Sequence, residues 1–563
     1  MKQALPFMLI ISLLSFVACN SEDKVGKDIP SAAFSMASRA FVEDAVQFTS
    51  TSYGGDGNYS YKWNFGDGEK STEENPKHIY EDKGVYIVTL KITDGNGNTN
   101  IYRKTIEILN KIVQIGDLSL KWTSSTHLAK LAGSTAALSR DGKSVYINSN
   151  DHVLRCYDSS NGSQQWEFNM ANPSFGTVAA GNSSMTASVD EDGTIYIGTG
   201  FSGNGKLFAI DANGNMKWFA FNNATDGFWN NGAESKPSLA YGTAVSDSKY
   251  VYCGNHGTIG SLVTFDKSTG KRVAYMANGA SGPAGGTYVG PVVTNQGMMV
   301  ILSGWGVHGV EKSKMERDDN TAVPWKWKSF AESQACFASI AVDYNGRVYG
   351  MRLTGGTSQK IFCIEGSTGA IVWEKLIDNT GKQDQGGLVI GTDGTVYASL
   401  KATGDLPGGI IALSPNNGEI KWQYESPESV SGTPAIDADG HILFGTEKGN
   451  FYILDSNGRD IVAALDVAGA ITNSHSPYAS EWLPTQGKFW SSPIIGNDGT
   501  IYIAITNVEN EKQSLMVALT SGLVSGPATS AWPMKGKDPQ HTSTIKYLHI
   551  ILLIIGSLSE KAP

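Results

Sequence analysis

The sequence predicts an all-β protein in which a small β-sandwich is followed by a large β-propeller. Glycine is abundant, with 65 residues among 563, and charged residues make up only 17% of the chain. A chain of this length exceeds the usual size of one hydrophobic core, and this composition is typical of many short strands joined by tight turns. From about residue 116 onward a turn signal recurs about every fifty residues, which indicates a repeat architecture.

The N-terminus has the pattern of a secreted lipoprotein. A basic start precedes an apolar run at residues 5–17, and Cys19 follows a small residue. The run is shorter than the ~20 residues that a membrane-spanning helix needs. This pattern resembles the lipobox of bacterial lipoproteins, which implies that residues 1–18 are a signal peptide and that Cys19 is lipidated. Residues 19–30 are then expected to be a flexible tether to the membrane.

The residues around the anchor and the overall charge bear on location and partners. Glu22 and Asp23, just after the cysteine, resemble the surface-export signal of Bacteroidetes lipoproteins. We therefore expect an outer membrane lipoprotein that lies on the cell surface or faces the periplasm. The formal net charge of -10 opposes a nucleic-acid partner, because such proteins need clustered Lys and Arg.

Residues 31–109 are expected to form the small sandwich. The segment Tyr61–Gly68 alternates aromatic and polar residues into an Asp-Gly turn, as a half-buried strand that ends in a hairpin does. Together with residues 76–80 and 84–94, this segment resembles the polycystic kidney disease (PKD) domain, an immunoglobulin-like module. The resemblance implies a spacer or a weak ligand contact, with Trp63 in the core.

The rest of the chain, residues 116–545, repeats itself. Eight turn signals define eight units: Asp141-Gly142, Asp192-Gly193, Asp247-Ser248, Asn295-Gln296-Gly297, Asn345-Gly346, Asp393-Gly394, Asp439-Gly440 and Asp498-Gly499. Apolar alternation follows most of these turns, and several units end in a strand that carries a tryptophan: Trp166, Trp218, Trp373 and Trp422. Each unit is interpreted as a four-stranded meander, which must stack on its neighbours to bury its faces. The predicted propeller therefore has eight blades, with seven as the alternative because the third, fourth and eighth units are degenerate.

The order of strands, Thr-Gly turn and Trp strand resembles the pyrroloquinoline quinone (PQQ) repeat family of eight-bladed propellers. That family includes quinoprotein dehydrogenases and non-catalytic scaffold lipoproteins. The resemblance implies that a dehydrogenase would hold its quinone with an adjacent Cys-Cys disulfide, a stacking Trp and a calcium ion. The sequence has no Cys-Cys pair, and Trp229 and Glu234 do not complete such a set. We therefore predict no cofactor.

The two ends of the repeat region predict how the ring closes. The eighth unit lacks a Trp strand, whereas residues 118–122 form an unmatched Trp strand ahead of the first unit. We expect this strand to complete the last blade. Residues 531–542 resemble the closing segment of such propellers, with Trp532 and His541 in packing and turn roles. The apolar tail, residues 546–563, is interpreted as an extra edge strand or an extension.

No catalytic or metal-binding residue is predicted. Cys156 and Cys363 occupy equivalent positions of two repeats, as small buried side chains would, and no Cys-x-x-Cys occurs. The acidic segments 190–193 and 437–440 coincide with the repeating hairpin turns. They also lack the downstream Glu of a calcium-binding EF-hand loop.

Ligand binding is therefore the function that the sequence favours. Aromatic-rich insertions interrupt the repeats, and loops on a rigid scaffold are where binding residues concentrate. The candidate ligand-binding residues are Trp229, Trp305, His308, Tyr478 and Trp482, each with packing as its alternative role. We predict a non-catalytic envelope lipoprotein whose propeller binds a polysaccharide or an envelope protein, with the small domain as spacer. The alternatives are a polysaccharide lyase or glycosidase and, behind these, a quinoprotein dehydrogenase.

Overall fold

The computed structural model describes residues 29–544 apart from the following: 37–38, 42–44, 110–117, 132, 176–185, 200–204, 221–242, 255–261, 277–289, 304–305, 318–320, 331–338, 355–357, 378–385, 404–406 and 539. The chain divides into two compact units, Met1–Val113 and Gln114–Pro563. Among the described residues, no helix has both the length and the apolar character needed to cross a bilayer. The expected signal peptide, Cys19 and the apolar tail lie outside the described residues.

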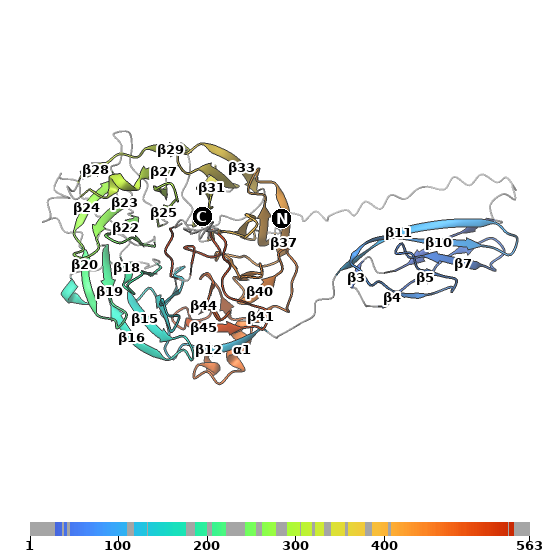
Figure 1. Ribbon diagram of the computed structural model, residues 1–563. Helices are drawn as coiled ribbons and strands as arrows, with labels where there is room; N and C mark the ends of the chain where they lie inside the picture. The colour runs from blue at the N-terminus through green and yellow to red at the C-terminus, as the bar shows by residue number, and fades with distance from the viewer. Residues whose placement is uncertain are drawn as a thin grey trace, which may run out of the picture. The chain divides into compact units, whose positions relative to one another are not determined.

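The first unit is a sandwich of short strands around an aromatic core (Figure 1). Its largest sheet has the order β3 (Arg39–Phe41), β11 (Thr99–Leu109), β10 (Gly84–Thr93), β7 (Ser60–Asn64) and β8 (Lys70–Ser71). Three strand pairs complete it: β1 (Pro30–Ser31) with β6 (Tyr53–Gly54), β2 (Phe34–Ser35) with β5 (Thr49–Ser50), and β4 (Ala45–Gln47) with β9 (Lys77–Ile79).

The predicted core position of Trp63 is confirmed. Its side chain is 1% exposed and meets the ring of Phe34 edge-on, with 4.9 Å between ring centroids. The indole nitrogen donates a hydrogen bond of 2.9 Å to the carbonyl of Glu73, which satisfies the one polar atom that the ring buries.

The described residues of the second unit form eight sheets of four or five strands arranged in a ring (Figure 1). Blade 1 consists of β13 (Ala137–Leu138), β14 (Ser144–Asn148), β15 (Val153–Asp158) and β16 (Gln164–Asn169), and blade 2 of β17 (Ser188–Val189), β18 (Ile195–Thr199), β19 (Lys206–Ile210) and β20 (Met216–Ala220). Blade 3 consists of β21 (Val245–Ser246), β22 (Tyr250–Gly254), β23 (Leu262–Asp266), β24 (Arg272–Met276) and the added β28 (Thr321–Val323). Blade 4 consists of β25 (Val292–Val293), β26 (Met298–Ser303), β27 (Gly306–Glu311) and β29 (Trp327–Ser329). Blade 5 consists of β30 (Ala341–Val342), β31 (Arg347–Thr354), β32 (Ser358–Glu365) and β33 (Ile371–Ile377), and blade 6 of β34 (Leu388–Ile390), β35 (Val396–Leu400), β36 (Gly408–Leu413) and β37 (Ile420–Ser426). Blade 7 consists of β38 (Ala435–Ile436), β39 (Ile442–Gly445), β40 (Asn450–Leu454) and β41 (Leu465–Asp466). Blade 8 consists of β43 (Ile494–Ile495), β44 (Ile501–Asn507), β45 (Leu515–Thr520) and β12 (Ser119–Thr123), and β42 (Gly487–Lys488) also pairs with β44. The helical turns are α1 (Val467–Thr472), η1 (Pro173–Phe175), η3 (Lys312–Met315) and η4 (Ala479–Glu481).

The ring closes as the sequence predicts. Strand β12 pairs antiparallel with β45, so residues from the two ends of the propeller share one sheet. Trp122 lies opposite Ala518, and the register shifts by one residue beside it. Non-covalent pairing of chain ends in one blade removes the open edges that an incomplete ring would leave.

Each of five tryptophans joins its blade to the next one. The indole packs on a glycine at a turn of the next blade, where the absence of a Cβ lets the ring approach. The ring nitrogen donates to a backbone carbonyl of that turn in five pairs: Trp122 to Ser159, Trp166 to Ala212, Trp218 to Lys267, Trp373 to Pro415 and Trp422 to Ser456, at 2.7–3.0 Å. We call this contact the tryptophan lock.

The lock also explains the buried cysteines. Cys156 lies opposite Trp166 and Cys363 opposite Trp373 in the strand ladders, and Ala412 holds the same position opposite Trp422. A small side chain there leaves room for the indole. The interpretation of these cysteines as small buried side chains is confirmed, because both are fully buried.

The described residues 525–538 and 540–544 run through the middle of the ring along the inner strands (Figure 1). Backbone amides of several blades donate to them, for example Ile390 to the carbonyl of Trp532 at 2.8 Å and Val189 to that of Gln540 at 2.9 Å. Trp532 is fully buried, and His541 is buried with Nε2 2.7 Å from the carbonyl of Ala136. Both residues have the packing roles that the sequence predicts.

Candidate binding surface

The meander of each blade gives the ring two different faces. Antiparallel strands send successive connections to opposite ends of a sheet. In most blades the connections from first to second and from third to fourth strand are tight turns, many with left-handed glycines such as Gly142 and Gly193 with φ of 73° and 79°. Blade 4 is an exception, because β27 ends at Glu311 and β29 begins only at Trp327. We call the side that carries the tight turns the turn face. The second-to-third and blade-to-blade connections emerge on the other side, the loop face, and nearly all of the long irregular segments belong to it.

Three of the five predicted ligand-binding residues lie within the described structure. Trp229 and Trp305 fall outside it. His308 lies in blade 4, whereas Tyr478 and Trp482 lie in the connection from blade 7 to blade 8, so the described candidates do not form one site.

His308 is 5% exposed, and its Nδ1 lies 3.3 Å from the hydroxyl of Ser303. Its ring packs on Trp325 with 5.0 Å between centroids. Burial, reinforced by the positive charge of Lys328, lowers the pKa of His308 to about 4. The imidazole is therefore neutral at physiological pH and belongs to the interior of its blade.

Trp482 is also an interior residue. Its side chain is 0% exposed, within the hydrophobic cluster that contains Val467 and Trp122. The indole presents no surface to a ligand. Sequence reasoning could not distinguish this role from an exposed one, because the surrounding insertion lacks the regular alternation of a strand.

Tyr478 lies at the surface and connects two loops. Its hydroxyl donates 2.8 Å to the carbonyl of Ser125, and its ring lies 4.0 Å from that of His127. Nε2 of His127 lies 2.9 Å from a carboxylate oxygen of Glu481. These contacts hold the insertion between blades 7 and 8 against the connection that leads into blade 1.

The structure adds a residue that the sequence analysis did not select. Trp490, in the same insertion, is half-buried and lies between two lysines. Nζ of Lys488 is 4.4 Å and Nζ of Lys130 is 5.5 Å from the centre of its ring. A cation over an indole face is favourable by about 0.5–1 kcal/mol at an exposed site. No local pattern could reveal this, because Lys130 and Trp490 are brought together only by closure of the ring.

Two glutamates pair with these lysines. Glu447 accepts from Nζ of Lys488 at 3.0 Å and lies 3.7 Å from that of Lys401, and Glu511 lies 2.5 Å from Nζ of Lys130. Burial alone would raise the pKa of Glu447, but its hydrogen bond from Ser431 and its two lysines outweigh burial and hold this pKa below the ordinary value. The carboxylate is therefore charged at neutral pH.

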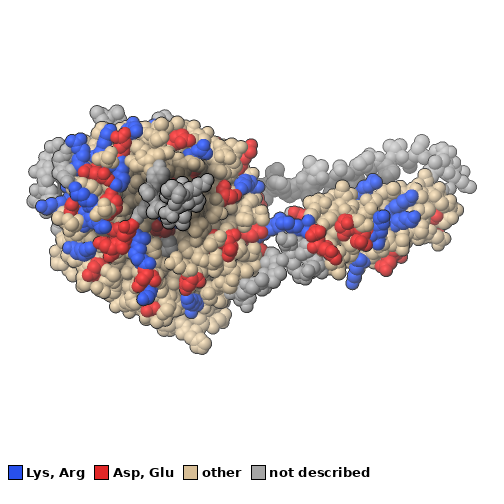
Figure 2. Space-filling model, viewed as in Figure 1, with Lys and Arg blue, Asp and Glu red and all other residues tan. Residues whose placement is uncertain are grey.

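We call Lys130, Glu447, Lys488, Trp490 and Glu511 the loop-face band. All five lie on loop-face connections of blades 7, 8 and 1. The band carries two lysines beside the indole and a glutamate paired with each of them, and Figure 2 shows a mixture of both signs of charge over the side of the ring in view. A mixed surface of this kind does not produce the single-sign field that phosphate backbones require.

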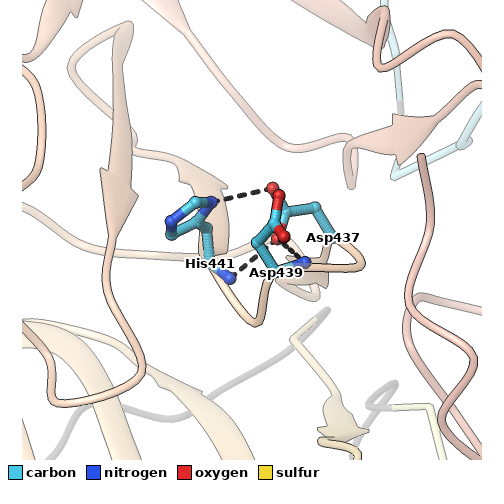
Figure 3. A group of neighbouring side chains, drawn as sticks. All are labelled: Asp437, Asp439 and His441. Atoms are coloured by element: carbon cyan, nitrogen blue, oxygen red, sulfur yellow. Dashed lines mark hydrogen bonds and ion pairs between the residues drawn. The ribbon is translucent and has the colours of Figure 1, made fainter. Parts of the chain in front are cut away.

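The group Asp437, Asp439 and His441 is the acidic turn of blade 7 (Figure 3). One oxygen of Asp437 accepts the backbone amides of Asp439 and His441 at 3.0 and 2.8 Å, and the other lies 2.8 Å from Nδ1 of His441. The amide of Ser525 also donates to Asp437, at 3.2 Å. These bonds use the carboxylate to hold the turn and the central segment, which supports the turn interpretation of residues 437–440. The hydrogen bond to Asp437 raises the pKa of His441.

The described residues do not fit a quinone site. The three described cysteines, Cys156, Cys253 and Cys363, lie in strands of blades 1, 3 and 5. No two of them can form the adjacent disulfide of quinoprotein dehydrogenases, and burial raises the pKa of each thiol to about 12. No step of a quinone-dependent reaction follows from this arrangement.

Comparison with protein families matches both units. The profile of the PKD domain matches residues 27–109. A second profile, described as outer membrane protein assembly factor BamB, matches residues 119–287 and 320–503.

Two curated relatives match short stretches of the chain. Collagenase ColA of Clostridium perfringens is 39% identical over 92 residues, which is 16% of this chain and 8% of that protein. The pre-pro-metalloprotease PrtV of Vibrio cholerae is 42% identical over 65 residues, which is 11% of this chain and 7% of that protein. The chain therefore spans less than a tenth of either relative.

Solved structures resemble each unit separately. Quinohemoprotein alcohol dehydrogenase from Comamonas testosteroni is 12% identical, with 75% of this chain and 79% of that chain covered and a TM-score of 0.51. BamB from Moraxella catarrhalis is 17% identical, with 70% and 97% covered and a TM-score of 0.44. The PKD1 domain of Vibrio cholerae PrtV is 38% identical, with 15% of this chain and 99% of that domain covered and a TM-score of 0.13. The first of these structures supports the propeller fold.

Proposed function

Because the chain belongs to the family of the outer membrane protein assembly factor BamB, we propose that its propeller is a non-catalytic binding scaffold for a protein of the cell envelope. The PKD domain serves as a spacer between a lipid anchor at Cys19 and the propeller. The protein acts at the outer membrane, on the cell surface or facing the periplasm.

The loop-face band carries this proposal. Trp490 offers a partly exposed indole between Lys130 and Lys488, and Glu447 and Glu511 add the opposite charge. Tryptophan is enriched among the few residues that carry most of the binding energy of protein interfaces, and charges of both signs around it select the orientation of the partner. A neutral polysaccharide carries no charge to complement the lysines and glutamates, whereas a protein partner can, so this band favours a protein over a neutral glycan.

Site-specific photo-crosslinking in intact envelopes tests the proposal. A photoreactive amino acid replaces Lys130 or Lys488 on the loop face and, as a matched control, Asp141 or Asp498 on the turn face. We expect both loop-face positions to give one common protein adduct and both turn-face positions to give none. An adduct from the turn face alone would contradict the assignment of the binding surface.

Removal of the central indole tests its contribution to affinity for the captured partner. We expect Trp490→Ala to weaken binding at least about thirtyfold, as for an interface residue worth about 2 kcal/mol. Tyr344→Ala is the control, because Tyr344 is an aromatic residue 49% exposed on the turn face. Equal affinities of the two variants would show that the partner binds elsewhere.

The enzymatic alternative has a direct test. Envelope polysaccharides are incubated with the purified protein, a glycan array reports binding, and mass spectrometry reports products. Under the proposal every polysaccharide is recovered intact. Released oligosaccharides, with or without an unsaturated end, would replace the scaffold proposal with a glycosidase or a lyase.

A further inference from the structure

The PKD domain carries a group of exposed cations on one side of its largest sheet. The other side of this sheet packs on the aromatic core around Trp63 (Figure 1). Side chains alternate between the two sides along a strand, and in β10 the core side takes Leu90 and Ile92, both 0% exposed. Lys91, between them, therefore lies on the outer side, where it is exposed.

The strand registers bring four cations together on this outer side. Lys91 lies directly opposite Lys62 of β7, and Arg103 of β11 is its diagonal neighbour. Lys70 of β8 lies opposite Asn64, two residues along β7 from Lys62. All four cations are exposed. We call Lys62, Lys70, Lys91 and Arg103 the basic patch.

The basic patch has no acidic partners on the described sheet. No ion pair joins any of its four residues to a described carboxylate. Glu107 of β11 is on the same side but lies opposite Val85, at the far end of β10 from Lys91. Like charges directly opposite each other destabilise a sheet, so the pairing of Lys62 with Lys91 opposes folding. The domain has more acidic than basic residues, and this segregation of its cations therefore indicates an anionic partner.

Exposed apolar side chains border the patch. Val85 and Ile87 of β10 are 68% and 59% exposed, and Ile101, directly opposite Lys91, is 46% exposed. Apolar atoms beside cations match the interface of a membrane, where charges meet the headgroups and apolar groups reach the acyl boundary. Figure 2 shows Lys and Arg atoms gathered over the part of this unit where Figure 1 draws β10 and β11.

Two considerations favour a membrane as the partner over an acidic protein. Lipid headgroups spread negative charge over an area, and about four Lys or Arg is the size of a cluster that binds anionic membranes. The expected tether, residues 19–30, spans at most ~40 Å from the lipid on Cys19, so the domain stays within that distance of the headgroups.

We propose that the basic patch docks the PKD domain on the anionic lipid headgroups of the membrane that holds the anchor. The Lys and Arg side chains contact lipid phosphates, and Ile87 and Ile101 reach the acyl boundary. The inference goes beyond the spacer role given to this domain above, and it rests on the lipid anchor of the proposed function.

Vesicle binding by the full chain with Cys19→Ser tests the proposal, because this variant has no lipid of its own. We expect binding to vesicles of equal parts phosphatidylglycerol and phosphatidylcholine, and none to phosphatidylcholine alone. Binding should also be lost in about 1 M salt, which screens charges beyond about 3 Å. Failure to bind the anionic vesicles, or equal binding to both kinds, would overturn the proposal.

Charge removal from the patch gives the expected magnitude. Each Lys or Arg near an anionic membrane contributes about fivefold in affinity, so Lys62→Gln together with Lys91→Gln should weaken binding at least about tenfold. Lys77→Gln together with Lys104→Gln is the matched control and should retain most of the affinity. Lys77 is exposed in β9, and Lys104 is exposed opposite Val88, on the core side of β11. Equal losses in the two double variants would overturn the proposal, because net charge alone would then attract the vesicles.

A fluorophore on an introduced cysteine locates the contact. Thr105 is exposed on the patch side, opposite Ile87, and Thr49 is exposed in β5, outside this sheet. On anionic vesicles the emission should shift to the blue for Thr105→Cys and stay unchanged for Thr49→Cys. A shift for Thr49→Cys alone would show that another side of the domain meets the lipid and would overturn the proposal.

Two further outcomes separate this inference from its alternatives. Binding to an acidic polysaccharide such as alginate, without binding to vesicles, would assign the patch to a polysaccharide and overturn the proposal. Loop-face crosslinks that persist in a chain that does not bind vesicles would leave the proposed function standing and remove this inference alone. Vesicle binding through the patch without any loop-face adduct would support this inference and count against the proposed scaffold.

Discussion

Replacing Gly270 by alanine tests the tryptophan lock between blades 2 and 3. Gly270 has φ of 70°, and an added Cβ would lie 2.5 Å from Cε3 of Trp218. The indole is 8% exposed, and its nitrogen donates 2.7 Å to the carbonyl of Lys267. Since the carbon atoms cannot overlap, the ring must lift away from the turn.

The free-energy cost has three parts. An alanine in the left-handed region costs about 1–2 kcal/mol. An indole buries about 150–250 Å² at about 25 cal/mol per Å², so re-exposing about a third of it costs about 1–2 kcal/mol. The hydrogen bond of the ring nitrogen adds about 1 kcal/mol. The unfolding free energy of Gly270→Ala should therefore fall by about 3–5 kcal/mol.

Gly142→Ala is the matched control. Gly142 has φ of 73° and nothing within 4 Å of an added Cβ, so only the backbone term applies. The thermal midpoint of the propeller should fall about 2–3 °C further in Gly270→Ala than in Gly142→Ala, given the large unfolding entropy of a unit of this size. Calorimetry of the full chain measures both midpoints.

Equal midpoints for the two glycine variants would refute the reasoning, because the lock would then contribute nothing to stability. A double-mutant cycle sharpens the test. In a Trp218→Leu background the ring is gone, so Gly270→Ala should cost no more than the backbone term, and undiminished cost would show that the clash is elsewhere.

Three other predictions follow from the titratable groups. Glu447→Gln should lower the thermal midpoint at pH 7. The difference from wild type should shrink as pH falls below 4.5 and vanish once pH is below the lowered pKa of Glu447, because this carboxyl contributes stability only while it is ionised. A difference that stays constant down to the most acid pH would contradict the ion pairs. The raised pKa of His441 contributes stability that is complete below pH 6.5 and is lost as pH rises through the raised pKa. His441→Gln should therefore remove this loss from a plot of thermal midpoint against pH. An unchanged plot would argue against the bond between His441 and Asp437. Iodoacetamide at pH 8 should leave Cys156, Cys253 and Cys363 unlabelled until urea unfolds the ring, and mass spectrometry measures the labelling. Labelling of these three cysteines in the folded protein would contradict their burial.

The fold could be predicted from sequence because its signals are local and repeated. A turn followed by alternating apolar residues specifies a hairpin wherever it occurs. The unmatched strand at Trp122 could complete only the unit that lacks a Trp strand, and it does pair with β45 in blade 8. The core position of Trp63 was implied by the resemblance to the PKD domain, and the packing roles of Trp532 and His541 by the resemblance of residues 531–542 to a propeller's closing segment; all three residues are buried.

The candidate site could not be predicted in this way. Trp482 and Tyr478 stand four residues apart in an insertion without periodicity, yet one is fully buried and the other is partly exposed. Their difference depends on what packs over them: side chains of α1, just before them in the chain, and of β12, far away in the chain.

The sequence by itself determined the two-unit all-β architecture, the repeat and the closing strand, because each depends on spacings of a few residues. Only the tertiary structure decided which loop residues meet. Closure of the ring brings Lys130 to Trp490, and it brings the hydroxyl of Thr123 in β12 within 2.7 Å of that of Ser476. Both depend on contacts between segments hundreds of residues apart, for which a single sequence carries no local signal.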